Sequence, residues 1–255
     1  ELIRAAARAY ATSGASQILW GLGVTEAGHG SNSVFAMINM AVMTGNIGRP
    51  GTGTCPIRGQ NNVQGASDVG ALQNVFSDYR KTTDEKARAD HKRIWKVEPP
   101  TNKGLRIPDM IDAACERKLK AMYILAEDVA QSDPDTAHIV EGLESLEFLV
   151  VQEIFMSETA SLAHVVLPGA SFLEKDGTFT NGERRVQRVR RALEPMAGSR
   201  ADWRILCDLM AATGYPQPFT EPSEILREVA ALVPAFRGLE YGALDRDGLQ
   251  WPVPA

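Results

Sequence analysis

This 255-residue sequence has few cysteines, no apolar run of membrane length and only a small excess of negative charge. Its three cysteines, Cys55, Cys115 and Cys207, form no CxxC pair, so the chain carries no local iron–sulfur or zinc motif. Such sparse cysteine favours a reducing compartment, and we expect a cytoplasmic protein. No apolar stretch approaches the roughly 18 residues that a membrane span needs, so no membrane insertion is expected. A net charge of −5 gives no reason to expect nucleic acid as a partner.

Strands and helices alternate in the middle of the chain. The apolar runs Ala121–Leu125, Phe148–Gln152 and His164–Leu167 are predicted strands, and helical segments separate them. This alternation predicts an α/β fold with a parallel, doubly wound, Rossmann-like sheet. Residues 172–192 differ, because they are polar and basic with valines between arginines, and they predict strands or a hairpin outside that sheet.

Other segments follow simpler patterns. Glu1–Ser13 and Asn32–Thr44 read as helices on either side of a short strand, and Asn32–Thr44 is expected to be largely buried because it is apolar on most sides. Residues 45–65 hold many glycines, prolines and amides and predict an ordered loop without regular structure. Residues 81–108 are charged and poor in large aliphatic side chains, which predicts an excursion on the surface.

The chain is expected to hold several regions. With 44% hydrophobic and 23% charged residues, it has the composition of a globular protein with a core. We predict the end of one α/β cofactor-binding domain over residues 1–60, a second α/β dinucleotide-binding domain over 61–171, a polar β segment over 172–200, and a helical return and linker over 201–255. Both ends interrupt this pattern, so we expect a fragment of a longer protein.

Glycines and polar side chains follow three predicted strands, at Gly21–Glu26, Ala126–Asp133 and Gln152–Glu153. Ligands bind beyond the carboxyl ends of strands in open parallel sheets, so these positions are candidate sites. A carboxylate there can accept hydrogen bonds from ribose or guanine, and a hydroxyl before a helix can bind phosphate. Two plainer alternatives stay open: the polar residues only cap the next helix, and the glycines only form a tight turn.

A glycine-rich loop surrounds one arginine. The run Thr44–Gly53 is followed by Arg58–Gly65, in which Arg58 stands among glycines and amides. These residues offer many donors and acceptors with little bulk, and the guanidinium adds a fixed charge with a planar donor fork. Such a group suits an oxyanion, a carboxylate substrate or a metal oxo centre. The alternative is a structural turn with a solvent-exposed arginine.

Taken in order, these motifs resemble those of molybdopterin oxidoreductases of the formate dehydrogenase type, in the central part of the catalytic subunit. The resemblance is carried by Thr44–Gly53, Arg58–Gly65, Ala126–Asp133, Val151–Met156, Val165–Pro168, Glu174–Asn181, Glu183–Gln187, Asp202–Trp203 and Gln250–Pro252. Each motif alone is moderately specific, whereas the ordered set is highly specific. The sequence departs from the pattern where Ala126 replaces a common glycine and His164 a usual aspartate.

The resemblance implies roles for residues at matching positions. Arg58 matches the arginine that orients formate beside the metal and stabilises charge during its oxidation. Residues matched to cofactor binding are Gly59 and Gln60 at a pterin, Leu22, Gly23 and Glu26 at one dinucleotide, and Glu127, Asp128, Ser132, Gln152, Glu153 and Asp202 at the other. Asp202 is the expected partner of a guanine edge. No residue of this chain matches a metal ligand.

The resemblance also implies cofactors and partners. It implies bis-molybdopterin guanine dinucleotide with molybdenum or tungsten, formate as substrate, and an electron-transfer subunit or an NAD- or ferredoxin-linked partner. A [4Fe-4S] cluster, the Cys or selenocysteine that ligates the metal and a domain that closes over the pterins are expected in parts of the protein outside this chain. We therefore expect this chain by itself to be inactive.

Three rival interpretations stay open from sequence. One is another molybdopterin oxidoreductase, such as a nitrate reductase, although the run Arg58–Asn62 favours formate dehydrogenase. Another is a scaffold without molybdenum, as in respiratory complex I, although charges such as Asp128 and Asp202 would then face an empty cavity. A nicotinamide-binding domain is weaker, because no GxGxxG follows a strand and opens a helix.

Overall fold

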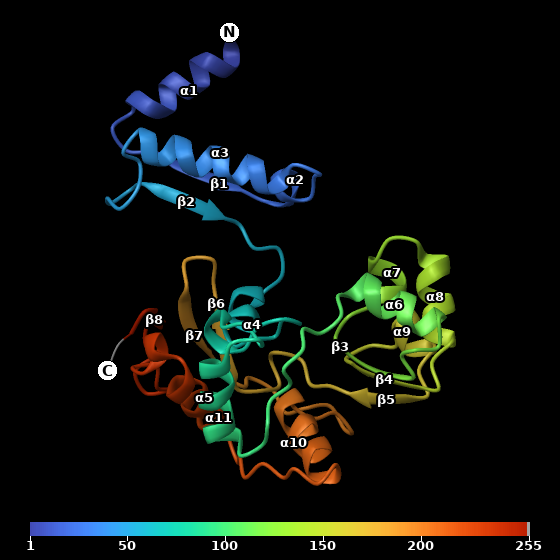
Figure 1. Ribbon diagram of the computed structural model, residues 1–255. Coiled ribbons are helices and arrows are strands. Elements are labelled where there is room, and N and C mark those ends of the chain that lie inside the picture. Colours follow the sequence, from blue (N-terminus) through green and yellow to red (C-terminus); the bar gives the residue numbers. More distant parts are fainter. Residues whose placement is uncertain (254–255) are drawn as a thin grey trace.

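The computed structural model describes residues 1–253, and its first part is a small βαβ unit (top of Figure 1). This unit contains α1 (Leu2–Thr12), β1 (Gln17–Trp20), α2 (Leu22–Thr25), α3 (Gly30–Met43) and β2 (Gly53–Pro56). Strands β1 and β2 pair in parallel, with Trp20 opposite Pro56, and α3 packs against both. Because the strands are parallel, the loops after β1 and β2 leave the same edge of this sheet.

Two expectations for this unit are wrong. Helix α3 is not largely buried: Phe35 and Met43 are 63% and 84% exposed, because only one side of the helix meets the two-stranded sheet within residues 1–253. The glycine-rich loop is not free of regular structure, because its residues 53–56 form β2 and the segment ends in α4 (Val63–Asp68). Residues 53–56 become a strand only by pairing with β1, a partner that lies 36 positions earlier (Gln17 opposite Gly53).

A second unit is built on three parallel strands (right side of Figure 1). It contains α6 (Ile107–Cys115), β3 (Ala121–Leu125), α7 (Val129–Ser132), α8 (Thr136–Glu144), β4 (Phe148–Glu153), α9 (Glu158–Ser161) and β5 (Val165–Pro168), with sheet order β3-β4-β5. Its core includes Ile111, Leu143, Leu149 and Val151, each at most 2% exposed. Burying an aliphatic side chain of this size contributes roughly 1.5–3 kcal/mol. The predicted parallel α/β class is therefore confirmed.

A third unit combines segments that are far apart in sequence (lower centre and left of Figure 1). It contains α4, a 3₁₀ turn at Ser77–Tyr79, α5 (Glu85–Trp95), β6 (Gly177–Thr180), β7 (Arg185–Val189), α11 (Pro222–Leu232), a 3₁₀ turn at Pro234–Phe236 and β8 (Leu249–Gln250). Strands β6, β7 and β8 form an antiparallel sheet, as the polar segment predicted. Helix α10 (Asp202–Ala212) lies between β7 and α11 in sequence, and its first residue, Asp202, pairs with Lys175.

The prediction of a surface excursion at residues 81–108 holds for most residues after α5, which are exposed, but α5 itself is partly buried. Ala87 and His91 are 1% and 0% exposed, and the His91 ring stacks on Phe76 with centroids 4.4 Å apart. Asp84 caps the helix by accepting from the Ala87 N–H at 2.9 Å. The few apolar side chains of this charged segment share one helix face, which packs on α11.

This packing bears on the domain boundary expected near residue 61. Trp95 Nε1 donates to Glu228 Oε1 at 3.1 Å, and Arg80 donates to the Leu232 carbonyl at 3.2 Å. These bonds tie residues 80–95, which include α5, to α11 and not to the parallel sheet. We therefore propose that the second α/β unit begins near residue 107. None of the helices between residues 1 and 253 is both long and apolar enough to cross a membrane.

Candidate functional site

A cavity of about 400 Å³ opens at the carboxyl ends of β3, β4 and β5. Three residues predicted to bind the cofactor, Gln152, Glu153 and Asp202, line it together. The other lining residues are Leu125, Ala126, Ile154, Gly169, Ala170, Ser171, Phe172 and Lys175. The edge of a parallel sheet where strands end is the usual ligand position in such folds, so the structure brings these predicted residues to the expected place.

The Asp202 carboxylate is held by donors from two directions. Gln152, which is only 1% exposed, donates from Nε2 to Asp202 Oδ1 at 2.6 Å, and it accepts a hydrogen bond from the Tyr123 hydroxyl. The Lys175 ammonium pairs with Asp202 Oδ2. Burial and the nearby Asp202 charge raise the pKa of Tyr123, which keeps its hydroxyl a donor at neutral pH. Asp202 is thus a fixed carboxylate at the mouth of the cavity.

Close packing at this edge restricts two backbone positions. A Cβ on Gly169 would lie 3.2 Å from Asp202 Oδ1, closer than most real contacts, so glycine lets the carboxylate approach the end of β5. Ala126 has φ +53°, in the left-handed region that favours glycine, and its N–H donates to the Gln152 carbonyl at 2.8 Å. Alanine at this position therefore still makes the backbone hydrogen bond, at the small conformational cost of a positive φ.

The residues predicted to bind the cofactor after β3 have two different roles in the structure. Asp128 Oδ1 accepts from the Thr159 N–H at 2.9 Å and from its hydroxyl at 2.7 Å. Burial raises the pKa of Asp128, but these bonds and one from the Glu158 N–H outweigh it and lower the pKa overall. The side chain does not cap α7, as the plainer alternative supposed, but holds the start of α9. Ser132, by contrast, is exposed and donates to Glu127 at 2.8 Å, which leaves that pair facing solvent.

Arg58 lies on a second cavity, of about 450 Å³, beyond the end of β2. Its walls are residues 55–62, which include Gly59 and Gln60, and residues 180–183 from the end of β6 and the turn that follows it. The Thr180 N–H donates to Asn62 Oδ1 at 2.9 Å and joins the two segments. A Cβ on Gly65 would lie 2.2 Å from that same Asn62 oxygen, so only glycine fits there.

A hydrogen-bond network centred on the buried Asp68 stands behind Arg58. Arg58 Nε donates to Gln64 Oε1 at 3.2 Å, and Gln64 Nε2 donates to Asp68 Oδ1 at 2.7 Å. Asp68, only 2% exposed, also accepts from the Tyr79 hydroxyl at 2.8 Å and from Trp251 Nε1 at 3.1 Å. A carboxylate can only accept, so Asp68 turns the amide nitrogen of Gln64 toward itself and the amide oxygen toward Arg58.

The same network changes the acidity of its tyrosine. Burial, the hydrogen bond to Asp68 and the charge of that carboxylate raise the pKa of Tyr79 to about 12. The hydroxyl therefore stays protonated and donating at every physiological pH.

The predicted residues Leu22, Gly23 and Glu26 lie on the exposed surface of α2 and at its end. They follow β1, and the Ile57 N–H donates to the Trp20 carbonyl at 2.7 Å beside them. These three residues follow β1 and Arg58 follows β2, so both lie at the same edge of the β1–β2 sheet. Leu22, Gly23 and Glu26 do not line the Arg58 cavity.

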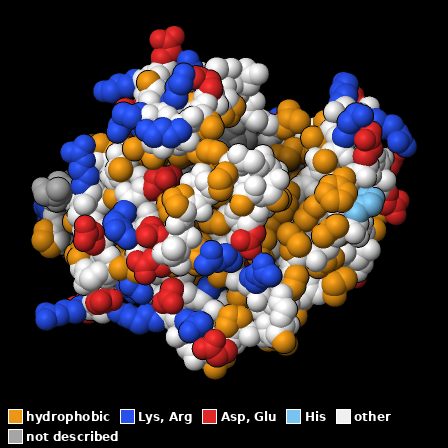
Figure 2. All heavy atoms as spheres, turned by 90° about the horizontal axis from the view of Figure 1, so that it is seen from below, with side chains coloured by type: hydrophobic (Ala, Val, Ile, Leu, Met, Phe, Trp, Pro, Cys, Tyr) orange, Lys and Arg blue, Asp and Glu red, His pale blue; other side chains and the backbone are white. Residues whose placement is uncertain are grey.

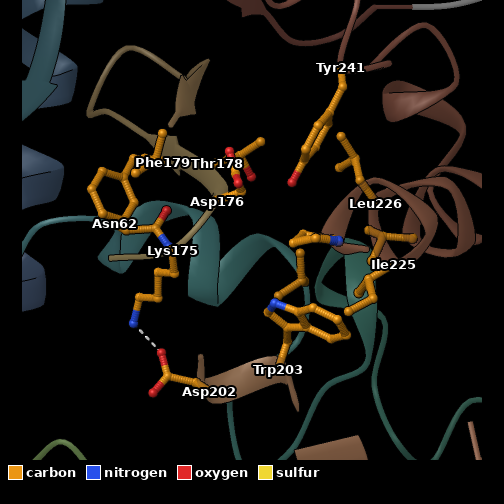
Figure 3. A pocket seen from close by; sticks show the side chains of 15 residues that line it. Asn62, Lys175, Asp176, Thr178, Phe179, Asp202, Trp203, Ile225, Leu226 and Tyr241 are labelled. Atoms are coloured by element: carbon orange, nitrogen blue, oxygen red, sulfur yellow. Dashed lines mark hydrogen bonds and ion pairs between the residues drawn. The ribbon is translucent and has the colours of Figure 1, made fainter. Parts of the chain in front are cut away.

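A third cavity, of about 370 Å³, lies between the other two and is shown in Figure 3. Asn62 is part of its wall and of the Arg58 cavity, while Lys175 and Asp202 are part of its wall and of the cavity at the parallel sheet. Trp203 and Tyr241 present aromatic surface on the opposite side. The three cavities thus adjoin one another in a row from Arg58 to the carboxyl edge of β3, β4 and β5.

The remaining sequence candidates have structural partners. His164 Nδ1 accepts from the Leu149 N–H at 3.0 Å, which fits a role in holding the strand. In the basic run, Arg188 stacks over Tyr241 at 3.7 Å and pairs with Asp176 at 3.5 Å, and Arg190 pairs with Asp245 at 2.7 Å. Acidic and basic side chains are also interspersed over the face shown in Figure 2. The run is therefore largely neutralised within the protein.

Sequence reasoning gave no role to several residues that the structure places at these sites. Lys175 lies within a motif that carried the resemblance, so a role could have been inferred from that match. Gln64 and Asp68 stand four residues apart next to Arg58, and a helix there would have put them on one face. Tyr123 and Thr159 had no local signal, because their partners Gln152 and Asp128 come from other elements.

Comparison with known proteins adds independent findings. Residues 7–212 match the family model described as molybdopterin oxidoreductase. The F420-dependent formate dehydrogenase subunit alpha of Methanocaldococcus jannaschii is 46% identical over 254 residues, which cover 99% of this chain and 37% of that protein. Formate dehydrogenase H of Escherichia coli is 39% identical over 252 residues, which cover 98% of this chain and 35% of that protein.

A solved structure shows the same fold. Acetylene hydratase from Pelobacter acetylenicus superposes with a TM-score of 0.69 at 17% identity, over 99% of this chain and 37% of that one. At this identity the likeness concerns the fold alone. The chain spans little more than a third of the length of the first two curated relatives it matches.

Proposed function

Because this chain belongs to the molybdopterin oxidoreductase family, we propose that it is the central part of a formate dehydrogenase catalytic subunit, which oxidises formate to carbon dioxide in the intact protein. The observation that carries this proposal is the identity of 39–46% to formate dehydrogenase subunits over nearly all of the chain. A subunit of another molybdopterin oxidoreductase, such as a nitrate reductase, has less support, because the two curated relatives compared above are formate dehydrogenases.

In this proposal Arg58 binds the carboxylate of formate. Its guanidinium carries a permanent charge and several donors, which suit both oxygens of a carboxylate. Within residues 1–253, Arg58 is engaged through Nε by Gln64, so its two terminal nitrogens are available to the cavity. Gln64 and Asp68 hold the guanidinium in one orientation, so little conformational freedom is lost when formate binds.

The residues that line these cavities have chemistry that suits a pterin dinucleotide. Asp202 offers a carboxylate that suits the N1–H and amino group of guanine, while Lys175 suits phosphate oxygens. Ser132 lies outside these cavities on the exposed surface, and we propose that it lies near the same dinucleotide. Gly59 and Gln60 would adjoin a pterin near Arg58. The row of adjoining cavities gives a long ligand an extended path between these groups.

The molybdopterin cofactor, when bound, supplies the metal centre that takes up the two electrons of formate oxidation. Residues of this chain bind and orient formate. Arg58 fixes the carboxylate and stabilises the charge of the reacting molecule, and the buried network behind it keeps that charge in place before the reaction begins.

We extend the proposal to finer points that the resemblance supports. The cofactor is the bis-guanine-dinucleotide form with molybdenum or tungsten, with Leu22, Gly23 and Glu26 at one dinucleotide and Glu127, Gln152, Glu153 and Asp202 at the other. A [4Fe-4S] cluster in the longer protein passes electrons to a separate electron-transfer partner, in the cytoplasm. Asp128 contributes by holding α9 beside this site.

The test compares the intact protein with its Arg58→Lys variant. Lysine keeps the charge and loses the planar fork, so kcat/KM for formate is expected to fall by about 10²-fold or more while molybdenum and pterin contents stay near wild type. Formate oxidation with an artificial acceptor and elemental analysis measure the two quantities. An intact protein that holds the cofactor and oxidises no formate would exclude the proposal, and one without pterin would favour a scaffold.

A further inference from the structure

A thiol, an imidazole and a carboxylate converge where α6 meets α8. Cys115 is the last residue of α6, and His138 and Glu141 lie one turn apart on α8. The two helices pack side by side in the second unit (Figure 1). Cys115 Sγ lies 3.8 Å from His138 Nδ1, and one ligand atom from each of the three residues lies within 4.8 Å of the others.

The imidazole is turned toward the thiol by a carboxylate on its other side. His138 Nε2 lies 2.9 Å from Asp112 Oδ1, one turn before Cys115 on α6. A carboxylate accepts only, so it holds the proton on Nε2 and leaves the lone pair of Nδ1 facing Cys115 and Glu141. Histidines that bind metals are commonly oriented in this way, with the second nitrogen donating to a carboxylate.

The surroundings also favour a cation. Besides Glu141, the carboxylates of Asp112 and Glu116 lie near the thiol of Cys115. Sulfur, nitrogen and oxygen together are the ligand set of zinc, which accepts all three in tetrahedral sites. With Zn–S of about 2.3 Å and Zn–N of about 2.0 Å, those two ligand atoms would lie roughly 3.5 Å apart, close to the 3.8 Å observed.

We propose that Cys115, His138 and Glu141 form a zinc site, with water as the fourth ligand and Asp112 as the residue that orients His138. None of these residues lines the three cavities, so the site is separate from the proposed formate and cofactor sites. Zinc there would join the end of α6 to α8. Helix α8 begins shortly after α7 and the exposed pair Glu127 and Ser132. It would also shield the Cys115 thiol from alkylation and oxidation.

The experiment uses the intact protein, dialysed against a chelator and then equilibrated with zinc chloride at buffered micromolar free zinc. Elemental mass spectrometry is expected to find one more zinc ion per chain in the wild type than in Cys115→Ser, His138→Gln or Glu141→Gln. Asp112→Asn is expected to weaken binding by roughly 10–100-fold without removing a ligand. Glu144→Gln is the matched control, because Glu144 is an exposed carboxylate on the same helix outside the cluster.

Alkylation gives a second readout that does not depend on other zinc sites in the protein. Zinc is expected to slow the reaction of Cys115 with iodoacetamide at least tenfold, measured by peptide mass spectrometry, and to leave Cys55 in the same sample unchanged. Equal zinc content in the wild type and in Glu141→Gln would overturn the proposal, and so would alkylation of Cys115 that ignores zinc. Glu141 is exposed, so its variant keeps the fold and decides the matter even if the other variants misfold.

Discussion

Replacement of Asp68 by asparagine tests whether a buried carboxylate holds Arg58 in place. Asp68 is 2% exposed and accepts from Gln64, Tyr79 and Trp251 at 2.7, 2.8 and 3.1 Å. Asparagine has the same shape, but its amide nitrogen donates, so at least one of the three donors must face another donor. Hydrogen bonds to charged groups contribute about 1.5–3 kcal/mol each, and a buried unsatisfied donor costs about 1–3 kcal/mol.

We therefore expect Asp68→Asn to lower the local stability by about 2–4 kcal/mol. At about 2–4 °C per kcal/mol for a folded region of 150–250 residues, this corresponds to a fall of roughly 4–16 °C in the apparent Tm. Thermal unfolding of the intact protein at a fixed scan rate measures it. Asp78→Asn is the control, because Asp78 is an exposed aspartate on the 3₁₀ turn next to Tyr79, and it is expected to change the apparent Tm by no more than about 1–2 °C.

The same variant has an expected effect on activity. Where the asparagine amide nitrogen faces Gln64, the Gln64 amide turns so that its oxygen accepts from it, and the Gln64 nitrogen then faces the Arg58 donor that its oxygen now serves. We expect kcat/KM for formate to fall about tenfold, which corresponds to about 1.4 kcal/mol, with cofactor content retained. If Asp68→Asn and Asp78→Asn gave the same Tm and the same kcat/KM, the network would not position Arg58 and the reasoning would be refuted.

Two further predictions concern Tyr79 and Asp202. Tyr79 has a pKa of about 12 in the folded protein and an ordinary value near 10 when unfolded, so its contribution to stability is full below about pH 10 and is lost as pH rises toward 12. Unfolding between pH 9 and 12 should therefore show a smaller loss in Tyr79→Phe than in the wild type, and equal losses would contradict this. Asp202→Asn removes the charge that pairs with Lys175 and the proposed guanine acceptor, so guanine dinucleotide content after purification should fall well below that of Arg58→Lys. Similar contents in the two variants would count against Asp202 as the guanine partner.

Local sequence patterns were sufficient for the parallel sheet. The strands predicted at Ala121–Leu125, Phe148–Gln152 and His164–Leu167 occur within about one residue of β3, β4 and β5. Each is a short apolar run bounded by turn residues, and such runs have few alternatives other than a buried strand. The order of motifs along the chain also identified the family, which the family model over residues 7–212 confirms.

Long-range pairing decided what those patterns missed. Residues 53–56 form β2 because β1 lies beside them, and the charged segment around α5 is partly buried because α11 covers its one apolar face. The expected burial of α3 rested on composition, whereas its exposure depends on which surfaces are available to cover it. In each case the deciding partner lies tens of residues or more away, where periodicity carries no information.

For the candidate site, local patterns in the sequence named Arg58 and Gln152 as candidates, and the resemblance to a known family added Asp202. Only the tertiary structure showed what holds them. Gln152 and Lys175 fix Asp202 across 50 and 27 positions, and Trp251 reaches Asp68 across 183. A sequence determines which groups are available for chemistry, but their orientation depends on hydrogen bonds between distant segments, and those exist only once the chain has packed.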